Sequence, residues 1–213
     1  MTRFAVISDL HGKYGHLQDI VEASRGRIDA IVMTGDYLEA KISKKHLHLG
    51  LEWPLEDVVD VDPELWSFLE SCTLVRGNQE ERIAAVMAGR PVPALLAPLL
   101  AAPGEWVTRT TRFVHGHGFP WARTGEQLDH PLLGDTVPPD RAVIVHGHSH
   151  RRLLTLGSGV RIEPVTGQPY VLASEGTCVV NVGAARDPEA HWVLYDEDAH
   201  TITFETARTT GVR

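Results

Sequence analysis

The sequence predicts an α/β protein in which two mixed β-sheets pack as a sandwich flanked by helices. Three observations predict this fold class. The front half alternates apolar, β-branched runs with helical patterns, the back half consists mainly of short strands separated by turn residues, and no linker divides the halves. With 213 residues, of which 43% are hydrophobic, the chain can bury one substantial core, so we expect a single domain over residues 1–213.

The opening residues predict a parallel β-α-β unit. Residues 3–9, RFAVISD, are an apolar run that ends in polar residues, which is typical of a buried strand leading into a loop. Residues 16–27 place Leu17 and Ile20 at helical spacing, and residues 28–36 form a second apolar run that ends in Gly-Asp. A right-handed crossover between two parallel strands follows from this order.

The middle of the chain adds surface segments and a third strand. Residues 38–53 show no period and carry several lysines and histidines, so we expect an excursion over the surface. Residues 63–71 predict a helix, residues 72–78 a third strand ending in Gly-Asn, and residues 80–90 another helix. The proline-rich residues 91–104 predict a kinked helix on the body of the protein.

The back half predicts strands. Two β runs are expected at residues 105–110 and 112–118. Short runs broken by Gly-Ser-Gly and Asp-Glu-Asp-Ala turns indicate antiparallel hairpins further on. These runs cover residues 141–150, 151–165, 177–185 and 191–206.

Composition argues against several function classes. The 28 acidic and 20 basic residues give a net charge of −8, which disfavours general nucleic-acid binding. Cys72 and Cys178 are too few for a disulfide framework, so both are expected to be buried thiols in a reducing compartment. No targeting segment or membrane span is evident, and we expect a cytoplasmic protein whose oligomeric state stays open.

Polar side chains follow the apolar runs where strands are expected to end. In layered α/β proteins, ligands bind at the carboxyl ends of strands, so these residues are expected to converge. The set contains two carboxylates, four imidazoles and one amide: Asp9, His11, Asp36, Asn78, His115, His148 and His150. Nitrogen and oxygen donors without a thiolate suit divalent Mn, Fe, Zn or Ni.

Seven such side chains are too many for one tetrahedral ion, but they suit two ions that share a carboxylate. Two-metal sites hold their ions roughly 3.5–4 Å apart and stabilise both the attacking and the leaving oxygen of a phosphate ester. Two divalent ions would also give the site a positive charge that attracts a phosphate ester to an acidic protein.

Five ordered motifs carry a family resemblance: DLH at 9–11, GDY at 35–37, GNQE at 77–80, His115, and GHSH at 147–150. They resemble the motifs of the calcineurin-like metallophosphoesterase superfamily, and VVNVGAARDP with the final hairpin looks like the ending of its small bacterial phosphodiesterase branch. The resemblance implies the sandwich fold and hydrolysis of a phosphate ester by in-line attack of a metal-bridging hydroxide. It also implies two divalent ions, Mn first, with Fe, Zn or Ni as alternatives.

The resemblance assigns the ligands to two ions. The first ion would be held by Asp9, His11, Asp36 and His150, with Asp36 also bridging, and the second by Asn78, His115 and His148. The tetrapeptide VHGH occurs twice, but only its leading histidine His115 is an implied ligand, whereas the leading His146 of the second copy is left over. Gly147 is expected to let the backbone turn so that the flanking histidines face different ions.

The chain departs from the family pattern at Gln79, where many members have a histidine that protonates the leaving group or steadies the transition state. Glutamine can donate a hydrogen bond but cannot deliver a proton near neutral pH. His117 is the expected substitute donor, and orienting His115 is its alternative role. Arg76 is a candidate phosphate contact or a surface ion pair, and Trp121 a candidate platform for an aromatic group.

The leading hypothesis is a metal-dependent phosphodiesterase acting on a small phosphate ester, with His117, Asn78 and Arg76 as candidate catalytic residues. A second hypothesis is a non-catalytic interaction scaffold on the same fold, with or without metal, similar to the retromer subunit that keeps the fold without catalysis. Gln79 favours the scaffold mildly, while the intact ligand set disfavours it because unpaired buried polar groups are costly. A third is a phosphoprotein phosphatase or dinucleoside polyphosphate hydrolase, for which the missing histidine is unexpected.

Overall fold

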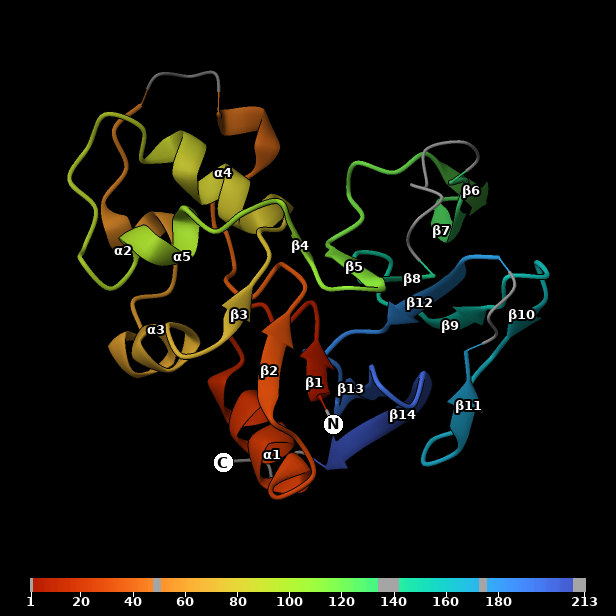
Figure 1. The fold of residues 1–213 in the computed structure, drawn as a ribbon. Coiled ribbons are helices and arrows are strands. Elements are labelled where there is room, and N and C mark those ends of the chain that lie inside the picture. The colour runs from red at the N-terminus through yellow and green to blue at the C-terminus, as the bar shows by residue number, and fades with distance from the viewer. Residues whose placement is uncertain (1, 48–50, 134–141, 173–175, 209–213) are drawn as a thin grey trace.

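Two six-stranded sheets lie at the centre of the protein (Figure 1). The computed structural model describes residues 2–47, 51–133, 142–172 and 176–208. The strands are β1 Arg3–Ile7, β2 Ala30–Met33, β3 Thr73–Leu74, β4 Glu105–Val107, β5 Thr111–Val114, β6 Trp121–Thr124, β7 Gln127–Pro131, β8 Val143–His146, β9 Arg152–Thr155, β10 Arg161–Ile162, β11 Pro169–Val171, β12 Cys178–Val182, β13 Glu189–Asp196 and β14 Thr201–Arg208. The helices are α1 Tyr14–Ser24, α2 Leu55–Val58, α3 Pro63–Leu69, α4 Asn78–Val86, α5 Ala97–Leu100 and the 3-10 helix η1 Lys44–His46.

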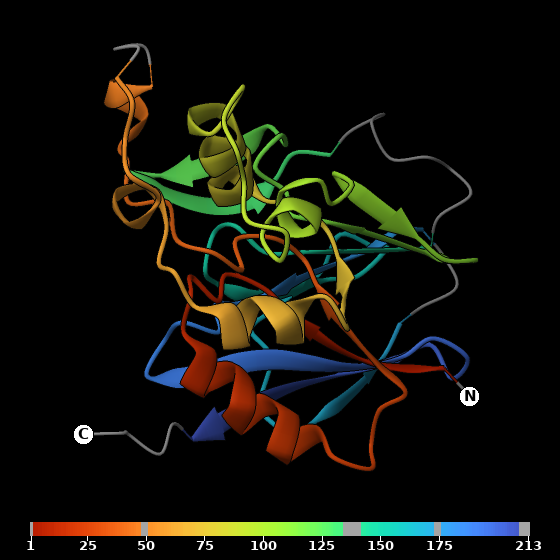
Figure 2. The same cartoon turned by 90° about the vertical axis from the view of Figure 1, so that its left-hand side faces the viewer.

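The first sheet has the strand order β11-β14-β13-β1-β2-β3. Within it β1 is parallel to β2, with Ala5 opposite Ile31, and antiparallel to β13. Ala5 and Ile7 point into the core beneath α1 and α3, which cover one face of this sheet (Figure 2). Phe4 and Val6 alternate with them and point into the core between the two sheets. This alternation explains why β1 reads as a continuous apolar run, since both of its faces are buried.

The second sheet has the order β10-β9-β12-β8-β5-β4. Its central strand β8 is parallel to both β5 and β12, and Val145 lies opposite Phe113. Phe113, Val145 and Val180 are fully buried and pack with Phe4 of the first sheet. Parallel neighbours end at the same sheet edge, so the loops after β5 and β8 leave the sheet side by side.

The structure confirms the two mixed sheets flanked by helices, the parallel β-α-β opening and the final antiparallel hairpin β13-β14. The kinked helix expected at 91–104 is wrong, because this proline-rich segment forms only the single turn α5. The surface excursion is also partly wrong: Leu38, Ala40 and Ile42 alternate into the helix-side core, and residues 48–50 lie outside the described residues.

The separate two-stranded sheet β6-β7 was not expected from the sequence. The two cysteines are free thiols, Cys178 buried and Cys72 half-buried. Among the residues that the structure describes, no helix combines the length and the apolar character that a bilayer span needs. The single-domain organisation remains a prediction.

Candidate metal centre

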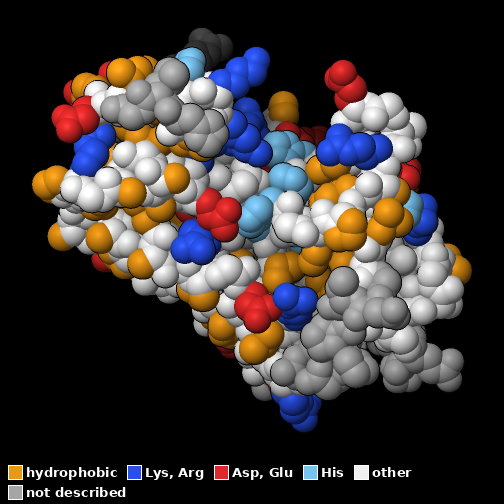
Figure 3. Space-filling model, turned by 90° about the horizontal axis from the view of Figure 1, so that it is seen from above, with side chains coloured by type: hydrophobic (Ala, Val, Ile, Leu, Met, Phe, Trp, Pro, Cys, Tyr) orange, Lys and Arg blue, Asp and Glu red, His pale blue; other side chains and the backbone are white. Residues whose placement is uncertain are grey.

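Four loops that follow strands meet at one end of the two sheets. The N–H of Asp9, after β1, donates to the carbonyl of Gly35, after β2, over 3.1 Å, and the N–H of Gly147, after β8, donates to the carbonyl of His115, after β5, over 3.2 Å. The N–H of His148 donates to Asp9 Oδ2 over 2.9 Å and thereby connects the loops of the two sheets. Histidine side chains gather in a hollow on this end of the molecule (Figure 3).

Backbone strain is concentrated in these loops. Positive φ angles occur at five of the predicted ligands, namely Asp9 at 54°, His11 at 50°, Asp36 at 52°, His148 at 75° and His150 at 59°. In the described part of the chain, the one other non-glycine residue with a positive φ is His200. Strained backbone of this kind persists where the surrounding structure imposes it, and it clusters at functional sites.

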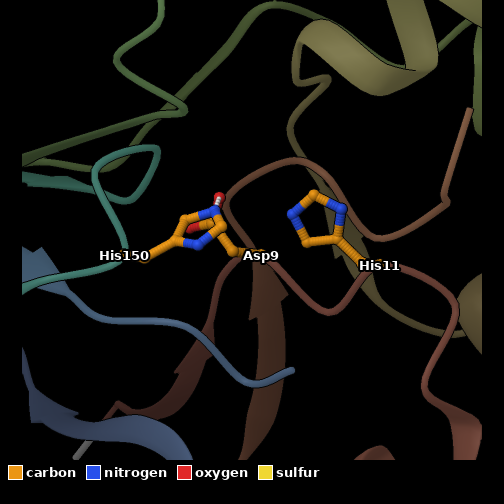
Figure 4. A group of neighbouring side chains, drawn as sticks. All are labelled: Asp9, His11 and His150. Atoms are coloured by element: carbon orange, nitrogen blue, oxygen red, sulfur yellow. Dashed lines mark ion pairs between the residues drawn. The ribbon is translucent and has the colours of Figure 1, made fainter. Parts of the chain in front are cut away.

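Asp9, His11 and His150 form the first cluster, in which one ligand atom of each residue lies within 4.8 Å of the others (Figure 4). Nε2 of His150 lies 3.3 Å from Oδ1 of Asp9. Asp9 and His11 are buried, whereas the His150 side chain is 40% exposed, so the cluster opens to solvent on the His150 side.

Asp36, His115 and His148 form the second cluster by the same measure. Nε2 of His115 lies 3.2 Å from Asp36 Oδ2 and 3.3 Å from His148 Nδ1. Asn78 is the first residue of α4, and its Oδ1 lies 3.2 Å from His115 Nε2. These nitrogen and oxygen atoms converge around His115 Nε2, and once His115 is deprotonated each can ligate a divalent cation.

Asp36 lies between the two clusters. Its Oδ2 is 4.0 Å from His11 Nε2 and 3.2 Å from His115 Nε2, while its Oδ1 accepts the N–H of Gln79 over 2.8 Å. One oxygen of Asp36 thus faces both groups of ligands, which fits the bridging role that the family resemblance implies.

The orientation of the imidazole rings supports a metal site. Nδ1 of His11 contacts the carboxylate of Glu39, and Nδ1 of His115 donates to the carbonyl of Thr34 over 2.9 Å, so each ring turns its Nε2 towards the site. Nε2 of His11 is buried and makes no hydrogen bond to the described residues, and the buried Oδ1 of Asp9 has His150 Nε2 beside it at 3.3 Å without a well-formed hydrogen bond. Buried polar atoms normally have partners, and divalent cations would supply them here, so the residues fit two such ions.

Glu80 lies within the GNQE motif, but the sequence did not predict its role, which is to hold the loops around the site. Its fully buried carboxylate accepts the N–H groups of Asp36 at 2.9 Å, Leu38 at 2.8 Å and Gly77 at 2.8 Å. Burial and the charge of Asp36 raise its pKa to about 7, while the hydrogen bonds from Leu38 and Gly77 favour the ionised form. A glutamate at the third position of a helix that follows a strand end was a usable signal, since such residues often reach back to the N-cap. For Glu39 the sequence carried no comparable signal.

Three glycines permit the close approach of the loops. A Cβ on Gly77 would overlap the carboxylate of Asp36, and one on Gly35, at φ 94°, would lie 2.7 Å from the His115 ring. Gly147 has no positive φ, so it is not needed for a left-handed turn. It is needed because a Cβ there would overlap Ser8 and Asp9.

The charges within the site shift the pKa of several ligands. Burial alone would raise the pKa of Asp9, but contact with His150 and the charge of His115 lower it below its usual range. Burial acts to lower the pKa of His115, yet the hydrogen bond to Asp36 and the charges of both aspartates raise it to about 9. Burial and the charge of His115 lower the pKa of His148 to about 4, so this ring is neutral at pH 7 and offers a lone pair.

The candidate catalytic residues lie at the rim of the second cluster. Nε2 of His117 lies 3.1 Å from Glu81, its ring centroid is 5.5 Å from that of His115, and its side chain is 29% exposed. Nε of Arg76 lies 3.7 Å from the same glutamate. Gln79 does not face the hollow, because its Oε1 accepts the N–H of Ala40 over 3.2 Å.

The residues near the second VHGH sequence have supporting positions. His146 is fully buried, donates from Nδ1 to the carbonyl of Gly147 over 2.9 Å, and packs against Trp121 with ring centroids 5.5 Å apart. Trp121 donates from Nε1 to the carbonyl of Gly116, so its ring is used in packing. Asn181, also unrecognised in the sequence, donates to the hydroxyl of Ser149 over 2.6 Å and holds the turn between the two histidine ligands.

The chain belongs to the calcineurin-like phosphoesterase superfamily, because the sequence model of this family's domain matches residues 2–200. Members of this family generally use divalent metals, and the two side-chain clusters agree with that chemistry. A comparison with curated proteins found no match.

Solved structures share the fold at low sequence identity. A metallophosphoesterase from Sphaerobacter thermophilus is similar with a TM-score of 0.67 and 18% identity, covering 98% of this chain and 89% of that chain. An archaeal phosphodiesterase reaches a TM-score of 0.50 with 10% identity, covering 96% and 99%. A protein serine/threonine phosphatase from Saccharomyces cerevisiae also reaches 0.50, with 11% identity, covering 100% and 81%. At these identities the likeness establishes the fold alone.

Proposed function

We propose that the protein is a dinuclear metal-dependent phosphoesterase that prefers small phosphodiesters. The observation that carries this proposal is the pair of ligand clusters on either side of one Asp36 oxygen. Asp9, His11 and His150 would hold one ion, Asn78, His115 and His148 the other, and Asp36 both. Two bound divalent ions would supply a nucleophile at neutral pH by lowering the pKa of water, and would stabilise charge on the phosphate oxygens.

The residues at the rim would serve the leaving group and the phosphate. When the bond between phosphorus and the leaving oxygen breaks, that oxygen must take up a proton. His117 is the candidate donor. Glu81 can only accept from its Nε2, so Nδ1, which has no partner among the described residues, would deliver the proton from the doubly protonated imidazolium. Arg76 would contact a phosphate oxygen. Its Nε lies 3.7 Å from Glu81, too far for a strong hydrogen bond, so the guanidinium group can bind a phosphate oxygen instead.

The proposed preference for diesters rests on the third motif, because small branches of the family that also lack a histidine at the position of Gln79 tend toward phosphodiesters. Gln79 cannot protonate a leaving group, and its side chain is occupied by the backbone of Ala40. A metal-free scaffold is disfavoured because the buried His11 Nε2 would stay without a hydrogen-bond partner among the described residues. We further propose a small phosphate ester as the substrate and no general nucleic-acid binding, given the net charge of −8.

The test is hydrolysis of bis-p-nitrophenyl phosphate against p-nitrophenyl phosphate, after metal removal by a chelator and restoration with Mn, Fe, Zn or Ni in turn. We expect metal-dependent cleavage of the diester, fastest with Mn, and no activity in an Asp9→Asn variant. Preference for the monoester would favour a phosphatase instead. Tight metal binding without turnover of either ester would favour the scaffold.

A further inference from the structure

An open cavity of about 820 Å³ lies beside the metal centre, between the β6-β7 hairpin and the turn that follows β8. The lining residues come from these two segments only: Thr124, Gln127, Leu128, Asp129, His148, Ser149, His150 and Arg151. Two of them, His148 and His150, are predicted metal ligands, so the cavity is continuous with the site proposed for the phosphate. A volume of this size accommodates a small organic molecule, since ligand pockets measure roughly 300–1,000 Å³.

The hairpin is fixed against the turn that carries the ligands. Nη1 of Arg151 donates to Oδ1 of Asp129 over 2.9 Å, and Nη2 of Arg161 donates to Nε2 of His130 over 2.8 Å. The ring of Trp121, at the start of the hairpin, lies 5.9 Å from that of His148. The cavity wall is therefore held in a defined position relative to the metal ligands, as a specificity pocket requires.

The lining favours an uncharged, hydrogen-bonding occupant. Asp129 and Arg151 neutralise each other, so neither is left to select a charged group. Leu128 is the one apolar side chain among the lining residues, which gives little surface for a hydrocarbon. Thr124 and Gln127 are exposed on the hairpin, and a hydroxyl and a carboxamide can both donate and accept hydrogen bonds.

We infer that the β6-β7 hairpin forms a subsite for one organic substituent of the phosphodiester, and that this substituent is uncharged and hydroxylated, in the manner of a sugar or nucleoside. The inference rests on the proposed function for the phosphate centre. Thr124 and Gln127 are the specificity-determining residues, because they line the cavity without belonging to the predicted metal ligands.

The test uses a matched pair of ligands and a matched control variant. Calorimetry on the manganese-loaded protein compares thymidine 5′-monophosphate with ethyl phosphate, which share the phosphate and differ in the substituent. We expect wild type to bind the nucleotide at least about tenfold more tightly, and the double variant Thr124→Ala/Gln127→Ala to lose this preference while still binding ethyl phosphate. Gln168→Ala, an exposed glutamine outside the cavity, is expected to keep the preference.

A kinetic comparison separates this inference from the proposed function. The p-nitrophenyl esters of the same two phosphates have an identical aryl group, and kcat/KM for ester consumption is expected to follow the binding preference. Cleavage of both esters without preference, or a preference that survives the double variant, would overturn the subsite and leave the hydrolase intact. Cleavage of neither ester, with hairpin-dependent nucleotide binding, would overturn the hydrolase and leave the subsite.

Discussion

The carboxylate of Glu80 accepts the backbone N–H of Asp36 over 2.9 Å, although 44 positions separate the two residues. Because the same carboxylate also accepts the N–H groups of Leu38 and Gly77, it holds the loop that presents Asp36 against the loop that leads into α4. The position of the proposed bridging ligand thus depends on a residue that does not itself face the metal clusters.

Glu80→Gln is expected to destabilise the fold by about 1–3 kcal/mol and to lower metal content, because the amide NH₂ would meet backbone donors where the carboxylate accepted them. Urea unfolding of the metal-free protein and elemental analysis of the loaded protein measure the two effects. Glu81→Gln, a change in the exposed neighbouring glutamate, should leave both quantities near wild type. Equal behaviour of the two variants would show that Glu80 does not organise the loop.

Glu39→Ala is expected to weaken metal binding by about 10–100-fold, since Glu39 holds Nδ1 of His11 and turns Nε2 towards the first cluster. Glu39→Gln retains an oxygen that can accept from His11 and should recover part of the affinity. Calorimetric titration with manganese gives both values. Unchanged affinity in Glu39→Ala would exclude this orienting role.

His117→Ala is expected to lower turnover of the diester by about 10²–10⁴-fold while metal content stays at the wild-type value, because His117 is proposed to protonate the leaving group without binding an ion. Glu81→Gln should produce a smaller loss, as it removes only the charge next to His117. Elemental analysis of the protein used in the kinetic assay distinguishes loss of the proton donor from loss of bound metal. Loss of metal in His117→Ala would make this histidine a ligand or a support of one.

Gly147→Ala is expected to destabilise the protein by about 1–3 kcal/mol, because the new methyl group would overlap Ser8 and Asp9 and force the loops of the two sheets apart. Gly104→Ala provides the control, since nothing lies within 4 Å of a Cβ at that position. Thermal unfolding measures the stability of both variants relative to wild type. A Gly147→Ala protein as stable as wild type would mean that the loops can separate without cost.

Strand ends made much of the site predictable from the sequence. Asp9 and Asp36 follow β1 and β2, which are parallel neighbours in the first sheet, and His115 follows β5, which is parallel to β8 in the second; the packing of the two sheets brings these strand ends together. The final hairpin was predictable for a similar reason, because a turn sequence separates its two alternating strands.

The residues that hold the ligands were not predictable in the same way. Glu39 acts through one hydrogen bond to the His11 side chain and Glu80 through three to backbone N–H groups. Apart from the place of Glu80 at the start of a helix, these contacts depend on loop geometry that no periodicity encodes. The β6-β7 hairpin was missed because its residues are mostly polar, and what fixes it is a set of contacts such as Arg151 with Asp129 across distant parts of the chain. Gly147 was recognised, but its steric reason became visible only when Ser8 was placed beside it.

The most direct test of the central claim is a crystal structure of the manganese-loaded protein with anomalous scattering measured for manganese. We predict two manganese ions roughly 3.5–4 Å apart, one bound by Asp9, His11 and His150 and the other by Asn78, His115 and His148, with an oxygen of Asp36 between them. A single ion, or ions bound away from these side chains, would contradict the account.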